Sequence, residues 1–99
     1  MQFLILAYDH EDPQALERRM AARPAHVALG DQLRAEGKLL MGVAILNEED
    51  QMIGSMIVAD FPSPEELDAW LNVEPYVTEN VWDSIEIAPC QVGQSFLPK

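Results

Sequence analysis

Apolar residues change their spacing along the chain, and the changes predict the order of its elements. Residues 2–8 form an apolar run of strand-forming residues that ends at a charged turn, the pattern of a buried strand. The spacing that follows is helical, with about 3.6 residues per turn. Its apolar positions are Leu16, Met20, Val27, Leu29 and Leu33.

Four residues set the expected limits of this first helix. Asp12 is the candidate N-cap, and Pro13 suits the first helical position. Pro24 predicts a kink or a fresh start, because proline lacks the N–H that the helix needs. Gly37 is typical of a helix end.

The second half of the chain returns to strand spacing. Two apolar runs, 39–46 and 52–59, flank the polar loop 47–50 and predict a hairpin. Ser63-Pro64-Glu65-Glu66 carries the cap, first-turn proline and capping box of a second helix. The remaining expectations are a turn or one-turn helix at Glu74-Pro75-Tyr76, a strand over 81–88, and an irregular tail from about residue 89.

The resulting order is βαββαβ, an α+β ferredoxin-like single domain over residues 1–99 with a four-stranded antiparallel sheet. Two helices cover only one face of such a sheet, yet both faces are apolar in the hairpin. Strand alternation places Leu39, Met41, Val43 and Ile45 on one face, and Leu40, Ala44 and Leu46 on the other. We therefore expect a homodimer in which a second copy covers the free face, with a ligand cavity beneath the covering.

Composition narrows the classes of partner. With 17 acidic and 6 basic residues, the net charge of −11 argues against nucleic acid and anionic membranes, and at long range it repels anionic substrates. The single Cys90 offers neither a disulfide nor a cysteine metal site. The first apolar run is too short to span a membrane, and no leader pattern precedes it. A cytoplasmic protein is the expectation.

His26 and Glu74 are the candidate catalytic pair. An imidazole titrates near neutrality, and a neighbouring carboxylate can fix its tautomer and raise its basicity. His26 shares the inward helical stripe with Leu29 and Leu33, so it is either a general acid/base or a half-buried structural histidine. Glu74 precedes a proline at an expected helix junction, and the alternative there is a solvated surface acid.

Three further residues are candidate substrate contacts. Ser55 follows Gly54 inside an apolar strand, so its hydroxyl bonds either the backbone or a ligand. Arg23 orients a carboxylate or forms a salt bridge, and Tyr76 is either core or ligand platform. A metal site at the Asp9–Asp12 turn lacks a distant ligand, and the turn is expected to be solvated. No metal or cofactor is predicted.

Five short motifs together resemble the YciI-like (YCII-related) family, over nearly the whole chain to residue 89. They are Arg23-Pro24-Ala25-His26, Gly37-Lys38-Leu39-Leu40-Met41-Gly42, Gly54-Ser55, Ser63-Pro64-Glu65-Glu66 and Glu74-Pro75-Tyr76-Val77. The resemblance implies a ferredoxin-like fold that pairs into a dimeric α/β barrel. It also implies a proposed catalytic His–Asp dyad, which falls on His26 and Glu74. The family usually has aspartate at position 74, and glutamate moves the carboxylate by about 1.5 Å.

Two functions follow from these observations. A characterised member of the family eliminates chloride from a chlorinated hydroxyhydroquinone, and muconolactone isomerases share the fold. The resemblance thus implies a cofactor-independent lyase or isomerase acting on a small cyclic oxygenated compound. In it His26 moves the proton. The alternative is a non-enzymatic binding or accessory dimer in which His26 is structural.

Overall fold

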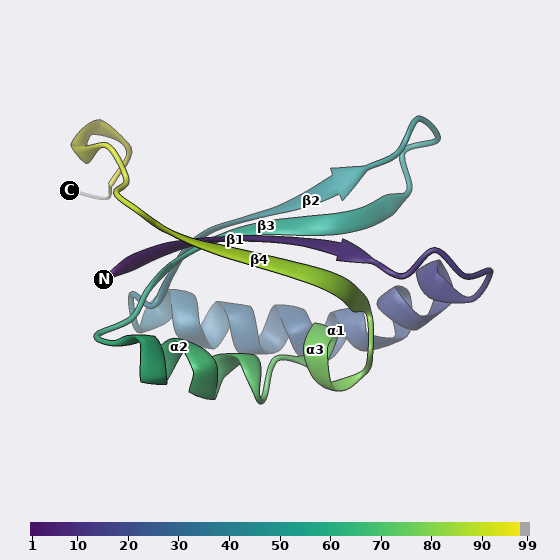
Figure 1. Ribbon diagram of the computed structural model, residues 1–99, viewed down its shortest axis with the longest axis horizontal. Coiled ribbons are helices and arrows are strands. Elements are labelled where there is room, and N and C mark those ends of the chain that lie inside the picture. Colours follow the sequence, from purple (N-terminus) through teal and green to yellow (C-terminus); the bar gives the residue numbers. More distant parts are fainter. Residues whose placement is uncertain (98–99) are drawn as a thin grey trace.

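The computed structural model describes residues 1–97 and shows one sheet with its three α-helices on one side (Figure 1). No helix within these residues is long and apolar enough to cross a membrane. The elements in chain order are β1 (Gln2–Asp9), α1 (Ala15–Ala35), β2 (Leu39–Leu46), β3 (Met52–Asp60), α2 (Pro64–Leu71), α3 (Pro75–Thr78), β4 (Trp82–Cys90) and the 3₁₀ turn η1 (Gln94–Phe96).

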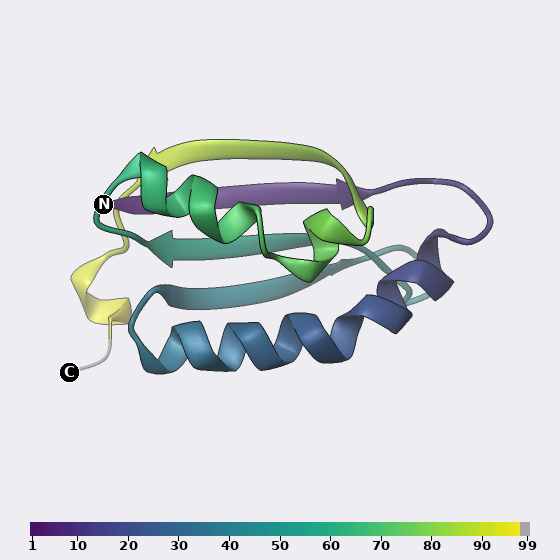
Figure 2. The ribbon, with the colours of Figure 1, turned by 90° about the horizontal axis from the view of Figure 1, so that it is seen from below.

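The four strands lie in the order β2-β3-β1-β4, and every neighbouring pair is antiparallel. Ile5 at the centre of β1 pairs with Ile57 of β3 and Ile87 of β4. Figure 2 shows α1 running beneath the β2 side of the sheet and α2 beneath the β4 side. The predicted βαββαβ ferredoxin-like fold is confirmed.

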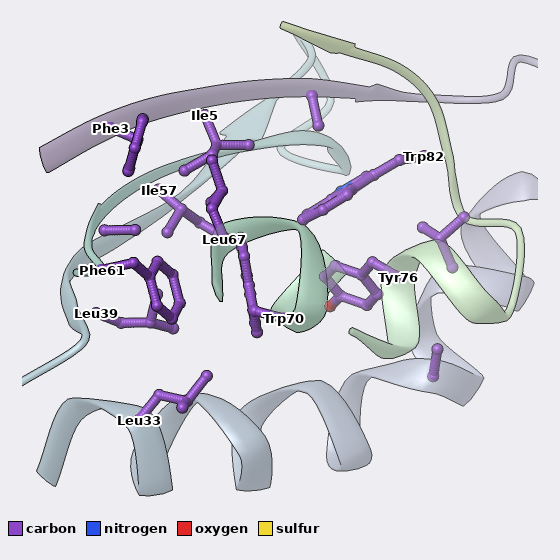
Figure 3. Close-up of a cluster of buried hydrophobic side chains, with 14 residues drawn as sticks. Phe3, Ile5, Leu33, Leu39, Ile57, Phe61, Leu67, Trp70, Tyr76 and Trp82 are labelled. Atoms are coloured by element: carbon purple, nitrogen blue, oxygen red, sulfur yellow. The ribbon is translucent and has the colours of Figure 1, made fainter. Parts of the chain in front are cut away.

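The core fills the layer between the sheet and the helices (Figure 3). Paired residues of neighbouring strands share a face of the sheet, so the buried Phe3, Ile5 and Ala7 define the face that the helices cover. Helix α2 contributes Leu67 and Trp70 to this layer, whereas α1 contributes Ala22 and Leu33. Burial of this apolar surface is the main source of stability.

The opposite face of the sheet, called the outer face below, is apolar and open in the single chain. Tyr8, Met41 and Val43 on this face are 44%, 53% and 44% exposed. The register places Leu4, Leu6, Met56 and Val58 beside them. Such an apolar patch is unusual on a protein that stays monomeric.

A bulge in β2 corrects one part of the alternation that the sequence predicts. Leu39 pairs with Ala59 on the helix-covered face, but Met41 pairs with Val58 on the outer face, because the register shifts between them. The extra residue, Leu40, shifts the alternation, so the side chain of Leu39 before it points to the helix-covered face. Leu39 is therefore a core residue and does not share a face with Met41 and Val43.

Helix α1 differs from the sequence prediction at its start and at its proline. It begins at Ala15, because the Asp12 carboxylate accepts from the backbone N–H of Gln14 at 3.2 Å and forms a turn ahead of the helix. Pro24 lies inside one continuous helix, and the first turns of α1 bend away from the rest (Figure 2). A bend is the usual result where proline cannot donate to the preceding turn.

The chain after β4 is more ordered than an irregular tail. The last strand continues to Cys90, and the 3₁₀ turn follows at Gln94–Phe96. The backbone N–H of Val92 donates to the Gln2 side chain at 2.7 Å and holds this segment against the start of β1. The final two residues of the predicted tail lie outside the described residues.

A glycine pair in the hairpin gives a stability prediction. A Cβ at Gly54 would lie 2.7 Å from the Ala7 carbonyl oxygen, whereas a Cβ at Gly42 would meet nothing within 4 Å. Gly54→Ala should therefore lower the free energy of unfolding by about 1–3 kcal/mol. Gly42→Ala, the matched control in the neighbouring strand, should not. Urea denaturation measures both, and equal stabilities would contradict this account of the β1–β3 spacing.

Candidate active site

The carboxylate of Glu74 is the fixed point of the site. Pro75 disfavours helical angles at the residue before it, so Glu74 is extended (φ −65°, ψ 121°) and forms the N-cap of α3. Its Oε1 accepts from the Tyr76 backbone N–H at 3.3 Å and is bonded to His26 Nδ1. The side chain is 1% exposed, so the alternative of a solvated surface acid is excluded.

Helix α1 supplies the imidazole of His26. Its ring stacks on the Tyr76 ring, with 3.9 Å between centroids and 12° between planes. The bond from Nδ1 to the Glu74 carboxylate places the proton on Nδ1 and leaves Nε2 as the nitrogen that can exchange a proton with a ligand. The side chain retains 22% exposure, so the ring is held on two sides and still reaches solvent.

A buried ion pair supports the other side of Tyr76. The Arg19 guanidinium lies 4.5 Å from the centroid of the Tyr76 ring, the geometry of a cation–π contact. Its Nη1 donates to Asp9 Oδ1 at 2.9 Å, and its Nη2 donates to Ser55 Oγ at 2.9 Å. Trp82 Nε1 donates to the same hydroxyl at 3.3 Å. Three strands and α1 therefore hold the ring on which His26 stacks.

Burial changes the ionisation of two groups in this network. Burial raises the pKa of Asp9 above its ordinary 3.8, and the positive charge of Arg19 opposes the shift. Burial likewise raises the pKa of the Tyr76 phenol above 10.0. Tyr76 therefore remains protonated at neutral pH and acts as a neutral platform, which leaves proton exchange in the site to His26.

His26 opens into a cleft of about 340 Å³ between α1 and β2. Arg23 and Tyr76 also line it, while the far wall is the segment 41–44 of β2. A volume of this order suits a small organic molecule. The cleft lies on the helix-covered side of the sheet, between the two layers, and not under the outer face.

The three predicted substrate contacts lie at different depths. Arg23 is exposed at the cleft, and Tyr76 lines it with its buried ring. Ser55 is 4% exposed, is not among the lining residues, and uses its hydroxyl to hold Arg19 and Trp82. Its connection to the cleft runs through Arg19, which is itself a lining residue.

Sequence reasoning missed Arg19 and Asp9 as members of the site. Three arginines occupy the first half of α1, and spacing does not distinguish the buried one from its neighbours. No local signal separates Arg19 from Arg18, because both lie three or four residues from Ala15 and Ala22, which the structure buries.

The turn after β1, considered as a metal site, serves a structural role. His10 Nε2 lies 3.1 Å from Asn80 Oδ1, and Arg18 donates both to Asp12 and to the Asn80 carbonyl. Among residues 1–97, no three His, Cys, Asp or Glu side chains gather as a metal cluster. These contacts join the turn to the segment before β4.

The fold and the site together define a ferredoxin-like α+β domain with a histidine–carboxylate pair beside a cleft. The chain belongs to the YCII-related domain family, whose model matches residues 1–91. It is 34% identical over 95 residues to Protein YciI of Escherichia coli, covering 90% of this chain and 95% of that protein. It is also 34% identical, over 95 residues and with the same coverage, to an uncharacterised protein of Haemophilus influenzae.

Solved structures agree on the fold. The chain is similar to 5-chloro-2-hydroxyhydroquinone dehydrochlorinase (TftG) of Burkholderia phenoliruptrix, with a TM-score of 0.81, 23% identity, and coverage of 96% and 98% of the two chains. That structure is a complex with 2,5-dihydroxybenzoquinone. An antibiotic biosynthesis monooxygenase is similar with a TM-score of 0.54 and 16% identity, covering 93% of this chain and 100% of the other.

The Arg19–Asp9 pair gives a pH-dependent prediction. Arg19→Met leaves the Asp9 carboxylate buried without its counter-charge, so the free energy of unfolding at neutral pH should fall by about 3–5 kcal/mol. The folded pKa of Asp9 lies above 3.8, so stability falls as pH rises from the unfolded pKa through the folded one. Without Arg19 the pKa of Asp9 in the folded protein rises further, so stability is lost over a pH range that reaches higher values. Lowering the pH should therefore restore part of the lost free energy of unfolding.

Arg18→Met is the matched control, since Arg18 pairs with the half-exposed Asp12 at 2.8 Å. It should cost much less, because solvent screens that pair. Urea denaturation across a pH series measures both variants. Equal losses in the two would show that Arg19 is not the buried support of Tyr76.

Proposed function

We propose that this protein is a small acid/base enzyme, a lyase or isomerase that moves a proton on a small cyclic oxygenated compound. The observation that carries the proposal is the buried Glu74 carboxylate bonded to Nδ1 of a cleft-lining imidazole. A structural histidine needs no open side, whereas the His26 ring keeps one. Proton transfer by an imidazole requires no cofactor.

The proposed step uses both states of His26. Nε2 takes a proton from a carbon or hydroxyl of the substrate, and the resulting imidazolium is stabilised by the Glu74 carboxylate. In an elimination, the electron pair left behind forms a double bond as the leaving group departs with its own pair. In an isomerisation, Nε2 returns the proton to another carbon. Glu74 holds the tautomer throughout.

The remaining residues bind and position. Arg23 contacts a substrate oxygen from the open side of the cleft, and the Tyr76 ring carries the stacked imidazole. Ser55 is a positioning residue in this proposal, because its hydroxyl holds Arg19 against Tyr76. The similarity to TftG, which binds a dihydroxybenzoquinone, supports a ring compound as the class of substrate.

The proposed protein is a homodimer, in which a second copy of the chain covers the outer face. The outer face carries exposed Tyr8, Met41 and Val43 next to half-buried Leu4, Leu6, Met56 and Val58. A domain of this size gains stability from a shared core. Because two copies with a charge of −11 each repel one another, an apolar contact is the natural one, and this face provides it.

His26→Gln tests the catalytic proposal better than alanine. An amide can still donate to the buried Glu74 carboxylate, so the fold should survive, but it cannot carry a proton. We expect turnover to fall by about 10²–10⁴-fold with little change in melting temperature. Chloride release from 5-chloro-2-hydroxyhydroquinone is the first assay.

His10→Gln is the matched control, since His10 is the chain's other histidine and bonds Asn80 outside the cleft. It should leave the rate unchanged. Two results favour the non-enzymatic binding module: an active His26→Gln variant, or a wild-type protein that binds the ring compound without turnover. Nitrogen-15 NMR should show the Nδ1–H tautomer of His26 in the wild type and its loss in Glu74→Gln.

Met56→Lys tests the second copy. A charge at the middle of the outer face should convert the dimer to monomer, since burying an unpaired ammonium is costly. Ala69→Lys adds the same charge on the exposed surface of α2 and should leave the dimer intact. Sedimentation velocity measures both, and a wild-type monomer would refute the proposed pairing.

A further inference from the structure

The cleft beside His26 carries a charge opposite to that of the whole chain. The sequence has only six lysines and arginines against 17 acidic residues. Among residues 1–97, three of those six, Arg19, Arg23 and Arg34, line this one cleft, and Asp31 is the only acidic residue that lines it. Half of the positive charge of a strongly acidic protein therefore faces one small hollow.

The three arginines differ in how far their charge is already neutralised. Arg19 is buried and paired with Asp9. Arg34 donates Nη1 to the Leu40 carbonyl, which uses one donor but does not cancel the charge. Arg23 is exposed at the cleft, and its guanidinium forms no hydrogen bond or ion pair within residues 1–97. Arg34 lies three positions after Asp31 on α1, so the Asp31 carboxylate offsets part of its charge. The cleft therefore presents Arg23 as its free guanidinium group within residues 1–97 and Arg34 as a second, partly offset one.

Spacing on α1 sets these groups around the imidazole. Residues three or four apart lie side by side on a helix, with about 5–6 Å between their Cβ atoms. Arg23 and His26 are three apart, and His26 is followed by Gly30 and then Arg34 at intervals of four. One face of α1 therefore carries, in order, the guanidinium of Arg23, the imidazole of His26, a glycine without a side chain, and the guanidinium of Arg34.

The empty position is matched on the opposite wall. Gly30 in α1 and Gly42 in β2 both line the cleft, and a Cβ at either would meet nothing within 4 Å. Glycine weakens helix and strand interiors, so nothing in the packing of the single chain calls for it at these two places. Their absent side chains keep open the space between the arginines.

We propose that this cleft binds a small planar ring that carries an anionic oxygen, with Arg23 as the main charge partner and Arg34 as the second. The inference deepens the proposed function and rests on it for the reaction itself. The anion is a carboxylate or an ionised ring hydroxyl, both of which arginine binds by charge-assisted hydrogen bonds. The ring occupies the space over Gly30 and Gly42, which places it beside His26 Nε2.

This arrangement reconciles an acidic protein with an anionic ligand. The overall charge of −11 repels anions at long range, but salt screens exposed charges beyond about 8–10 Å. Within the cleft, three arginines outnumber the one lining carboxylate, Asp31, so the local field favours an anion. A neutral ring of the same shape would gain the contact with the walls but not the charge pairing.

Two pairs of probes test the charge. Benzoate is compared with benzamide, and para-nitrophenolate at mildly alkaline pH with nitrobenzene; each pair matches in shape and differs in charge. Amide chemical shifts around residues 23–34 and 41–44, measured on the whole protein, report binding. We expect at least one anion to bind about tenfold more tightly than its neutral partner, and the pair that shows it identifies the anionic group.

Arg23→Gln should reduce that preference to about threefold or less, with the affinity for the neutral probe unchanged. Lys38→Gln removes the same charge outside the cleft, where Lys38 pairs with Glu36 at 3.4 Å, and should preserve the preference. Gly30→Leu, which favours the helix but fills the space, should abolish binding of all four probes.

Equal affinities within both pairs, or no shifts at the cleft with any probe, would overturn the inference. An equal effect of Lys38→Gln and Arg23→Gln would also overturn it, since overall charge would then explain the preference. None of these results touches the catalytic proposal. That proposal fails if His26→Gln retains full turnover or if the wild-type protein binds the ring compound without turnover, so the two failures can be told apart.

Discussion

The site depends on the Glu74 carboxylate, which connects α1 to α3. One oxygen accepts from the Tyr76 backbone, which begins α3, and from His26, which belongs to α1. A buried carboxylate is costly unless such donors satisfy it, so this oxygen links two elements that are 48 residues apart. The same bond assigns the proton to Nδ1 and frees Nε2. The contact between Glu74 and His26 therefore serves both the packing of the two elements and the proposed proton transfer. Glutamate makes this contact in place of the family's usual aspartate.

The Tyr76 ring packs between the imidazole of His26 and side chains that the sheet holds in place. His26 stacks on the ring, Arg19 lies 4.5 Å from the ring centroid, and Trp82 meets it edge-on at 5.7 Å. Arg19 is in turn fixed by Asp9 and Ser55. Ends of β1 and β4 and the middle of β3 therefore hold a residue of the short helix α3, whose four residues would not form a stable helix alone.

The sequence predicts the fold well because hydrophobic spacing and caps are local signals. It predicts the site less well, because the site depends on distances between elements. His26 shares the inward stripe of α1, and Glu74 precedes a proline at a helix junction, so both could be singled out. Spacing alone could not show that the two side chains meet. Arg19 could not be separated from Arg18, since both lie three or four positions from Ala15 and Ala22 and so fit the same apolar spacing. The bulge at Leu40 carries no glycine or other marker, so strict alternation misplaced Leu39.

Several features that weaken the fold gather at the same cleft, which is an argument for function rather than chance. Gly30 costs the helix about 1 kcal/mol relative to alanine, and Pro24 removes a hydrogen bond four residues earlier in the site's own helix. Within the described residues, Asp9 Oδ2 and Arg19 Nε are buried without a hydrogen-bond partner. Proteins tend to depart from local rules at functional sites. Most of these departures surround one imidazole. The α2 half of the helical layer has the regular Ser63 cap and one departure of its own, the Trp70 Nε1, which is also buried without a hydrogen-bond partner within the described residues.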